Sequence, residues 1–195
     1  MRRFAILGST ARADAGFNLN DVAGTSGRLD VLLRCIRAAM MASHGLREEV
    51  VVYLVLGAGP RAPRTVRLDS AGVRFLRPDE RSLAVLLRKV LETDYGGHEL
   101  VVMRPGVSIA GGGLGRVLAD APGARTFVLD EGAPDLRSAD LGGEDLLFVV
   151  GGHEGIPDAD RALLAGAQPL GIGPVSVHAD DAIAILVNEL DRRCC

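Results

Sequence analysis

The 195-residue sequence contains no tryptophan, and aromatic residues make up only 4% of it. Extensive stacking of bases on aromatic platforms, as in common single-strand-binding proteins, is therefore poorly supported. Cysteine is also scarce: Cys35, Cys194 and Cys195 form no disulfide framework, and two adjacent cysteines do not pair easily with each other. No Cys/His group has zinc-ligand spacing. We expect a protein of a reducing cytosol without a structural metal.

Long apolar runs are absent as well. No run reaches the 18 residues of a candidate membrane span, and residues 1–7 lack the long apolar region and cleavage site of a signal peptide. Neither membrane insertion nor export is indicated, so we expect a cytoplasmic protein. With 48% apolar and 24% charged residues, the chain can bury one substantial core. Neither internal repeats nor a Ser-rich linker are found, and 1–195 is expected to be a single domain with an elaborated N-terminal part.

Charge is distributed unevenly along the chain. Residues 1–100 carry 15 Lys/Arg and 11 Asp/Glu, whereas residues 101–195 carry 7 and 14. A polyanion would therefore prefer the N-terminal half. A solvated, Arg-rich surface without a partner explains the same numbers equally well.

Short apolar runs alternate with segments of helical spacing, which predicts an α/β domain with a mostly parallel sheet. The stretch 65–75 favours a hairpin, because Asp69-Ser70-Ala71-Gly72 suits a turn. The predicted strands are 4–7, 50–56, 65–68, 73–75, 107–110, 126–129, 146–150 and 169–172. The predicted helices are 28–44, 80–93, 113–120, 158–165 and 178–193.

Two apolar runs near the C-terminus end in turns of glycine and proline, at 151–157 and 171–174. Such turns are expected where a backbone approaches a flat ligand, and ligands bind at the carboxyl ends of parallel strands. The stretch 57–62 formally fits a G-x-G-x-x-A dinucleotide fingerprint, but prolines leave no room for the helix that would face a pyrophosphate. The cluster 111–115 lacks the Lys-Ser/Thr of a P-loop. We therefore expect the cofactor site in the last third of the chain.

Four blocks of sequence carry a family resemblance. They are Gly24-Thr25-Ser26-Gly27-Arg28-Leu29-Asp30, Pro78-Asp79-Glu80-Arg81, Val149-Val150-Gly151-Gly152-His153-Glu154-Gly155-Ile156, and His178-Ala179. In this order and over nearly the whole chain, they resemble the archaeal-type tRNA pseudouridine-54 N1-methyltransferases of the SPOUT superfamily. The resemblance implies methyl transfer from S-adenosylmethionine to N1 of pseudouridine 54 in the tRNA T-arm. It also implies a SPOUT-type parallel sheet with helices on both faces, a C-terminal trefoil knot and a homodimer, with the last helix, 182–190, as a candidate interface.

The same resemblance implies a set of cofactor-binding residues, in which backbone groups read the adenine edge and aliphatic side chains form the walls. The set is Leu129, Gly151, Gly152, Gly155, Leu170, Ile172, Gly173, Pro174, Val175 and Val177. Without the family, ordinary core packing would explain the aliphatic residues. The sequence departs from some relatives at Gly152, Glu154 and Ala182, and Ala23 replaces a proline that is common in the family. These departures concern cofactor details and the choice of RNA more than the reaction class.

Methylation of N1 of pseudouridine requires that a weakly acidic N–H lose its proton and that charge on the ring carbonyl be stabilised. Asp21 is the predicted base or base-orienting carboxylate, and Arg28 is predicted to hold a phosphate or a base carbonyl. Asp30 is a third catalytic candidate, although acidic residues in a first helical turn commonly serve only the helix dipole. His153, His178, Cys194 and Cys195 are held as secondary candidates.

Other functions stay open at this stage. A SPOUT enzyme acting on another RNA uridine or pseudouridine, or a non-catalytic RNA-binding relative, would share the N-terminal basic face. An NAD-dependent oxidoreductase would depend on residues 57–62. Binding of S-adenosylmethionine or of a nicotinamide cofactor would distinguish these classes.

Overall fold

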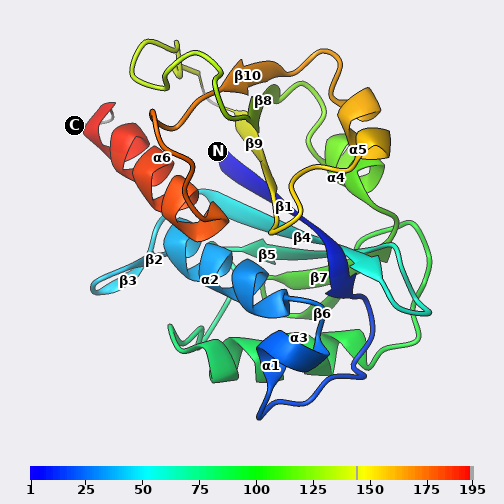
Figure 1. Ribbon diagram of the computed structural model, residues 1–195. Coiled ribbons are helices and arrows are strands. Elements are labelled where there is room, and N and C mark those ends of the chain that lie inside the picture. The colour runs from blue at the N-terminus through cyan, green and yellow to red at the C-terminus, as the bar shows by residue number, and fades with distance from the viewer. Residues whose placement is uncertain (144, 194–195) are drawn as a thin grey trace.

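An eight-stranded sheet forms the centre of the molecule, in the order β10-β8-β9-β1-β4-β5-β7-β6 (Figure 1). A computed structural model describes residues 1–143 and 145–193. The sheet consists of β1 (Arg2–Arg12), β4 (Val50–Ala58), β5 (Arg64–Asp69), β6 (Val101–Arg104), β7 (Val107–Gly111), β8 (Arg125–Leu129), β9 (Leu146–Gly151) and β10 (Gln168–Leu170). A separate two-stranded hairpin pairs β2 (Met41–Ala42) with β3 (Gly45–Leu46).

Helices cover both faces of the sheet, as the sequence predicts. They are α1 (Val22–Thr25), α2 (Leu29–Met40), α3 (Glu80–Leu91), α4 (Leu114–Asp120), α5 (Asp158–Leu163) and α6 (Ala179–Arg193). Strand β1 shows how two cores arise: Phe4 and Ile6 pack with residues of α2, α3 and α6, whereas Ala5 and Leu7 pack with residues of α4. Because both faces are covered, residues 4–7 of β1 and 50–56 of β4 are continuous apolar runs without the polar alternation of a half-exposed strand.

The sheet is parallel over β10, β8, β9, β1 and β4, and antiparallel over β5, β7 and β6. The prediction of a mostly parallel sheet is therefore correct for the half that contains the C-terminal strands. In that half the carboxyl ends of β8, β9 and β10 lie at one edge, which is where an α/β sheet binds ligands.

The predicted hairpin of 65–68 with 73–75 is wrong. Strand β5 pairs instead with two strands that are distant in sequence, so that Val66 lies opposite both Leu54 of β4 and Ile109 of β7. Residues 73–75 form no strand. The local turn at 69–72 is real, but pairing of β5 between two buried strands replaces the local partner, and this competition is invisible to a short sequence window.

Two further differences concern element ends. The helix expected over 28–44 ends at Met40, because the β2–β3 hairpin takes residues 41–46. Strand β6 was not predicted; it is an edge strand whose Val101, Val102 and Met103 are exposed. Within residues 1–143 and 145–193, no helix combines the length and apolar character required to cross a membrane.

Candidate active site

A cleft of about 870 Å³ opens at the carboxyl ends of β8 and β9. Leu129 and Gly151 line it at the ends of these two strands, and the segment that follows β10 forms a third wall. The first turns of α2 and α6 complete it through Arg28, Val31 and Ala182. The position is the one expected for ligand binding in a parallel α/β sheet.

Most residues of the predicted cofactor set line this cleft. They are Leu129, Gly151, Gly152, Gly155, Ile172, Gly173, Pro174, Val175 and Val177. Leu170 does not line it: its side chain is 1% exposed and belongs to the hydrophobic core, in register with Leu129 of β8. The apolar side chain of Leu170 therefore serves packing beneath the cleft.

The third wall of the cleft is held against a second loop. The Gly171 N–H donates to the Pro134 carbonyl at 2.9 Å, and the Gly171 carbonyl accepts from the Leu136 N–H at 2.8 Å. A Cβ at position 171 would lie 2.4 Å from the Ala133 oxygen, so only glycine permits this approach. Beyond it, Val175 is 71% exposed and Val177 is 42% exposed on the cleft. Two solvent-exposed aliphatic side chains, on a backbone that is held by hydrogen bonds at Gly171, suit the flat apolar face of a ligand.

The cleft also has an acidic end that the sequence reasoning missed. Asp130 and Glu131 directly follow β8 and line the cleft. Asp130 forms an ion pair with Arg161 at 3.1 Å, and Glu131 accepts a hydrogen bond from the Ser176 hydroxyl. The sequence does contain a signal for these two residues, because they follow the predicted strand 126–129 directly. Polar side chains at that position lie at the same edge of the sheet as the other strand ends.

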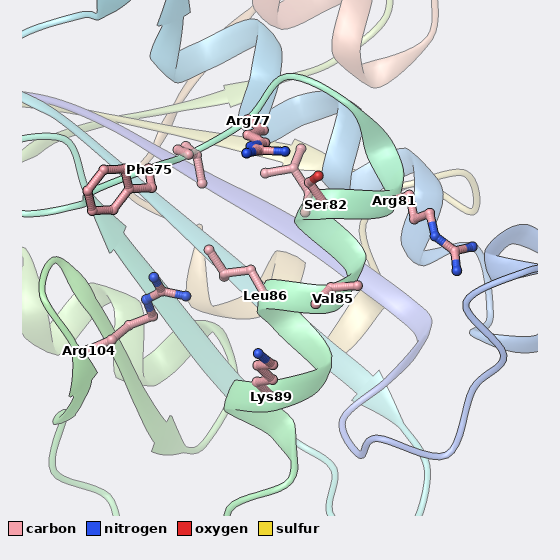
Figure 2. A pocket seen from close by; sticks show the side chains of 10 residues that line it. Phe75, Arg77, Arg81, Ser82, Val85, Leu86, Lys89 and Arg104 are labelled. Carbon is pink, nitrogen blue, oxygen red and sulfur yellow. The ribbon is translucent and has the colours of Figure 1, made fainter.

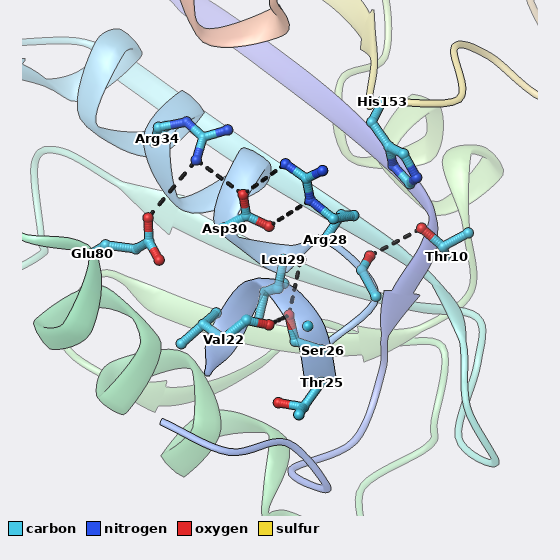
Figure 3. A network of polar contacts seen from close by, with 12 residues as sticks. Thr10, Val22, Thr25, Ser26, Arg28, Leu29, Asp30, Arg34, Glu80 and His153 are labelled. Atoms are coloured by element: carbon cyan, nitrogen blue, oxygen red, sulfur yellow. Dashed lines mark hydrogen bonds and ion pairs between the residues drawn. The ribbon is translucent and has the colours of Figure 1, made fainter. Parts of the chain in front are cut away.

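The block Gly24 to Asp30 forms a tight turn that leads into α2 (Figure 3). Gly27 has a φ of +67°, and a Cβ there would lie 1.8 Å from the Thr10 oxygen. The Thr10 hydroxyl donates to the Gly27 carbonyl at 3.0 Å. Ser26 then satisfies the start of α2, because its hydroxyl accepts from the Leu29 N–H at 3.0 Å. The turn thus fixes the backbone from which Arg28 projects.

Arg28 and Asp30 form a two-pronged ion pair at the edge of the cleft. Nε and Nη2 of Arg28 donate to Oδ1 and Oδ2 of Asp30, both at 3.0 Å. Arg28 itself has a φ of +66°, an uncommon conformation for a non-glycine residue and one that is associated with functional sites. Arg28 lines the cleft, whereas Asp30 is only 3% exposed and lies outside the lining.

Asp30 also accepts a hydrogen bond from Nη1 of Arg34 at 3.0 Å. Burial by itself would raise the pKa of the Asp30 carboxyl, but the hydrogen bonds and charges of Arg28 and Arg34 outweigh it, and the pKa is below its ordinary value. The hydrogen bond with Asp30 in turn raises the pKa of Arg28. Asp30 is therefore ionised near neutral pH, with both oxygens engaged, and is suited to hold Arg28 rather than to accept a proton.

Arg34 joins three helices at this point. Figure 3 shows its contacts with Asp30 and Glu80. Besides Asp30 of its own helix, Arg34 lies 3.8 Å from the Glu80 carboxylate at the start of α3 and 3.4 Å from the Asp180 carboxylate at the start of α6. The contact with Arg34 gives a structural role to Glu80 of the block 78–81. Asp79 caps α3 by accepting from the Ser82 N–H at 2.8 Å. The block thus fixes α3 beside the turn that presents Arg28.

Asp21, the predicted base, lies apart from this cluster. Its carboxylate caps α1 by accepting from the Gly24 N–H at 2.9 Å, and the residue is exposed and outside the cleft lining. His153 and His178 line the cleft. Cys194 and Cys195 lie outside the described residues. The structure thus brings together Arg28 and most of the cofactor set, with Asp30 behind Arg28.

The other two glycine clusters lack the geometry of nucleotide sites. Residues 57–62 lead from β4 into β5, so no helix begins there to face a pyrophosphate. Residues 111–115 make a tight connection from β7 to α4. Neither cluster lines the cleft described above.

Comparison with known proteins places these observations in a family. Residues 1–194 match the family described as "Putative SAM-dependent RNA methyltransferase". The chain belongs to this family. Curated relatives named tRNA (pseudouridine(54)-N(1))-methyltransferase include that of Methanosarcina acetivorans, 36% identical over 98% of this chain and 92% of the relative, and that of Haloferax volcanii, 40% identical over 98% and 96%. The resemblance inferred from the sequence blocks is confirmed.

A solved structure supports the fold independently. The Nep1 protein of Archaeoglobus fulgidus, bound to S-adenosylhomocysteine, superposes with a TM-score of 0.70 over 99% of each chain at 12% sequence identity. At that identity the likeness concerns the arrangement of the chain alone. The α/β architecture expected from the sequence is therefore confirmed in its coarse form: a large central sheet with helices.

Proposed function

We propose that this protein transfers a methyl group from S-adenosylmethionine to N1 of pseudouridine 54 in the T-arm of tRNA. The observation that carries the proposal is that the end of β8, the glycine-rich turns after β9 and β10, and Arg28, which are far apart in sequence, meet at one cleft. The names of the curated relatives, at 36–40% identity over almost the entire chain, support the target nucleoside.

The residues of the cleft fit the proposed cofactor. A Cβ at Gly173 would meet nothing within 4 Å, so the backbone there is open to a ligand, and Val175 and Val177 offer exposed apolar surface beside it. The carboxylates of Asp130 and Glu131 at the same cleft suit a ligand that carries positive charge and hydroxyl groups. When bound, S-adenosylmethionine supplies the electrophilic methyl group. The protein then contributes mainly the alignment of the attacking nitrogen.

Arg28 is the proposed catalytic group that stabilises negative charge. Loss of the N1 proton places charge on the ring carbonyls of pseudouridine, and a guanidinium at the cleft edge can hydrogen-bond to that oxygen. Asp30 is the proposed positioning residue, because its two oxygens fix the plane of the Arg28 guanidinium. Asp21 stays our proposed base or base-orienting carboxylate; since it is outside the cleft lining, it requires RNA that crosses the start of α1.

The trefoil knot and the homodimer are part of the same proposal. In support of the knot, the segment after β10 bonds to residues 134–136, and Arg193 at the end of α6 donates to the carbonyls of Leu136 and Ala139. In support of a dimer, Val175, Val177 and Ile185 are exposed apolar side chains near the cleft. Along 182–190, however, Ile183, Leu186 and Leu190 face the core, so this helix offers less interface than the sequence suggested. Action on tRNA also fits a cytoplasmic location.

The test is incubation of the purified protein with labelled S-adenosylmethionine and T-arm RNA that carries pseudouridine or uridine at position 54, followed by nucleoside analysis. N1-methylpseudouridine from the pseudouridine RNA alone is the expected result. Cofactor binding by calorimetry without transfer would redirect the target to another RNA. Binding of neither cofactor nor RNA would overturn the proposal.

A further inference from the structure

A second, shallower cleft of about 300 Å³ lies between α3, the loop 75–77 and the end of β6 (Figure 2). We call it the Phe75 cleft and define it by Phe75, Arg77, Arg81, Lys89 and Arg104. It shares no lining residue with the first cleft. Figure 2 shows the Phe75 ring and the Arg104 guanidinium on one side and α3 with Lys89 on the other.

Phe75 is held outward at a cost to the fold. Its side chain is 94% exposed, although phenylalanine is strongly apolar, and its backbone has a φ of +57°. A bulky residue at positive φ is a backbone outlier. Val73, two residues earlier, is buried and anchors the loop. An apolar ring that is almost fully exposed beside a cleft points to a partner outside the chain.

The cations around Phe75 are available. Across residues 1–143 and 145–193, Arg77, Lys89 and Arg104 have neither an ion pair nor a side-chain hydrogen bond. Arg81 donates to the Leu19 carbonyl and the Asn20 side chain, at 3.1 and 2.8 Å, and so keeps its full positive charge.

The neighbouring carboxylates offset this charge only in part: the hydrogen bond from Ser82 and, less strongly, the charge of Arg77 hold the pKa of Asp79 below its ordinary value. Asp79 caps α3, and Glu80 lies toward Arg34 of the first cleft. Neither lines the Phe75 cleft. Its charge is therefore complementary to an anion.

The combination of an exposed ring with unpaired cations selects the chemistry of the partner. Unpaired nucleotides offer both a flat face that stacks on an aromatic ring and a phosphate that binds arginine or lysine. A paired duplex offers the phosphates without the free face. The scarcity of aromatics in the chain is consistent with this, because one ring serves one base and no extended platform is required.

Helix α3 connects the two clefts. Glu80 at its start contacts Arg34, which lines the first cleft, and Lys89 near its end lines the Phe75 cleft. At 1.5 Å per residue, the two positions are about 14 Å apart along the helix. A single RNA strand of a few nucleotides can therefore contact both.

We propose that the Phe75 cleft binds an unpaired nucleotide flanking the target nucleoside, with Phe75 stacked on its base and Arg77, Lys89 and Arg104 contacting phosphates. This rests on the proposed function for the identity of the RNA. Phe75 then acts in substrate binding and not in methyl transfer.

The principal test compares wild type, Phe75→Ala, Phe75→Leu and Phe75→Trp with T-arm RNA that carries pseudouridine 54. Loss of one stacked base predicts a rise in KM and in Kd for RNA of about 5- to 100-fold in Phe75→Ala, with kcat and the Kd for S-adenosylhomocysteine unchanged. Phe75→Trp should retain binding. Phe75→Leu keeps the apolar character of the side chain but removes the aromatic ring, so this variant should lose most of the RNA binding. Thermal unfolding checks that each variant folds.

A charge test and a footprint accompany it. Arg77→Gln combined with Arg104→Gln should lower the salt-dependence slope of RNA binding by about 1.4, whereas Arg192→Gln at the exposed end of α6 should leave it unchanged. Lys89 is the only lysine of the chain. An amine-reactive reagent therefore labels Lys89 and the α-amino group, and RNA should protect Lys89 selectively.

The outcomes separate this proposal from the proposed function. Methyl transfer by wild type with an unchanged KM in Phe75→Ala would overturn the cleft proposal and leave the enzyme activity standing. If RNA binding depends on Phe75 but wild type transfers no methyl group, the cleft proposal stands and the proposed enzyme activity is overturned. If Phe75→Ala instead lowers the mass measured by light scattering while RNA binding is unchanged, the cleft is a self-association surface, together with the exposed Val102 of β6, and the RNA proposal is wrong.

Discussion

Asp30 holds the Arg28 guanidinium through both of its carboxylate oxygens, each 3.0 Å from a guanidinium nitrogen. This buried carboxylate is two residues from the arginine in sequence, and the reach is possible because Arg28 has left-handed backbone angles. The pair therefore depends on the turn at Gly27 and on the helix that begins at Leu29. Its effects on stability and on catalysis can be separated by substitution.

Asp30→Asn should destabilise the protein at neutral pH by about 1–2 kcal/mol, because the buried carboxylate accepts hydrogen bonds from two arginines that are themselves partly solvated. The folded-state pKa of Asp30 is below its ordinary value, so its contribution is fully present above the unfolded pKa of about 3.9 and is lost as pH falls through the folded pKa. Urea unfolding at pH 7 and at decreasing pH measures the difference. A gap between wild type and variant that widened in acid would contradict this account.

Arg28→Lys should reduce kcat by roughly 10- to 100-fold with little change in cofactor affinity, because lysine keeps the charge and loses the planar two-pronged pair with Asp30. Single-turnover kinetics with saturating RNA isolates the chemical step. Arg37→Lys, on the same helix but outside the cleft lining, is the matched control. Equal single-turnover rates in Arg28→Lys and Arg37→Lys would show that Arg28 has no catalytic role.

Gly27→Ala should lower stability by about 3 kcal/mol or more, since its Cβ would lie 1.8 Å from the Thr10 oxygen and its φ is positive. Gly45→Ala is a suitable control, because a Cβ there meets nothing within 4 Å. Thermal denaturation of both variants decides the matter. A Gly27 variant as stable as the control would show that the turn adopts another conformation in solution.

The sequence predicts the half of this fold in which local pattern and tertiary structure agree. The run 146–150 becomes a buried parallel strand, and 50–56 becomes a buried strand that is parallel to β1 and antiparallel to β5. The glycine-rich stretches after 150 and 170 form one cleft as expected. Residues 73–75 fail because β5 is paired on both sides by distant strands, which no local window records. Strand β6 was missed because an edge strand need not show a buried run.

The site is predicted in the same uneven way. Family blocks identify Arg28 and the glycine turns, but they do not separate residues that line the cleft from those that support it. Leu170 belongs to the core and Asp30 lies behind Arg28. Whether a side chain lines the cleft or supports it depends on the direction in which it points from the backbone. Arg34 joins three helices, and its partners Glu80 and Asp180 are too distant in sequence for any spacing rule to pair them.

Gly173→Leu should weaken binding of S-adenosylhomocysteine by at least tenfold without loss of stability. A side chain at this position enters open space, since a Cβ there meets nothing within 4 Å, and residue 173 lines the cleft between Ile172 and Pro174. Isothermal titration calorimetry gives the affinity. Gly166→Leu is the control, because that glycine is equally unobstructed and lies outside the cleft lining. Equal affinities in both variants would show that the cofactor does not contact the backbone at 173.

The position of Asp21 outside the cleft lining leads to the last prediction. If RNA crosses the start of α1 and brings the N1 proton to this carboxylate, Asp21→Asn should lower kcat by about 100-fold. Asparagine can still cap α1, so the fold should be retained. His153→Gln is the informative comparison, since His153 lines the cleft and Asp21 does not. If Asp21→Asn leaves kcat unchanged while His153→Gln lowers it, the proton leaves through the cleft and Asp21 serves only to cap α1.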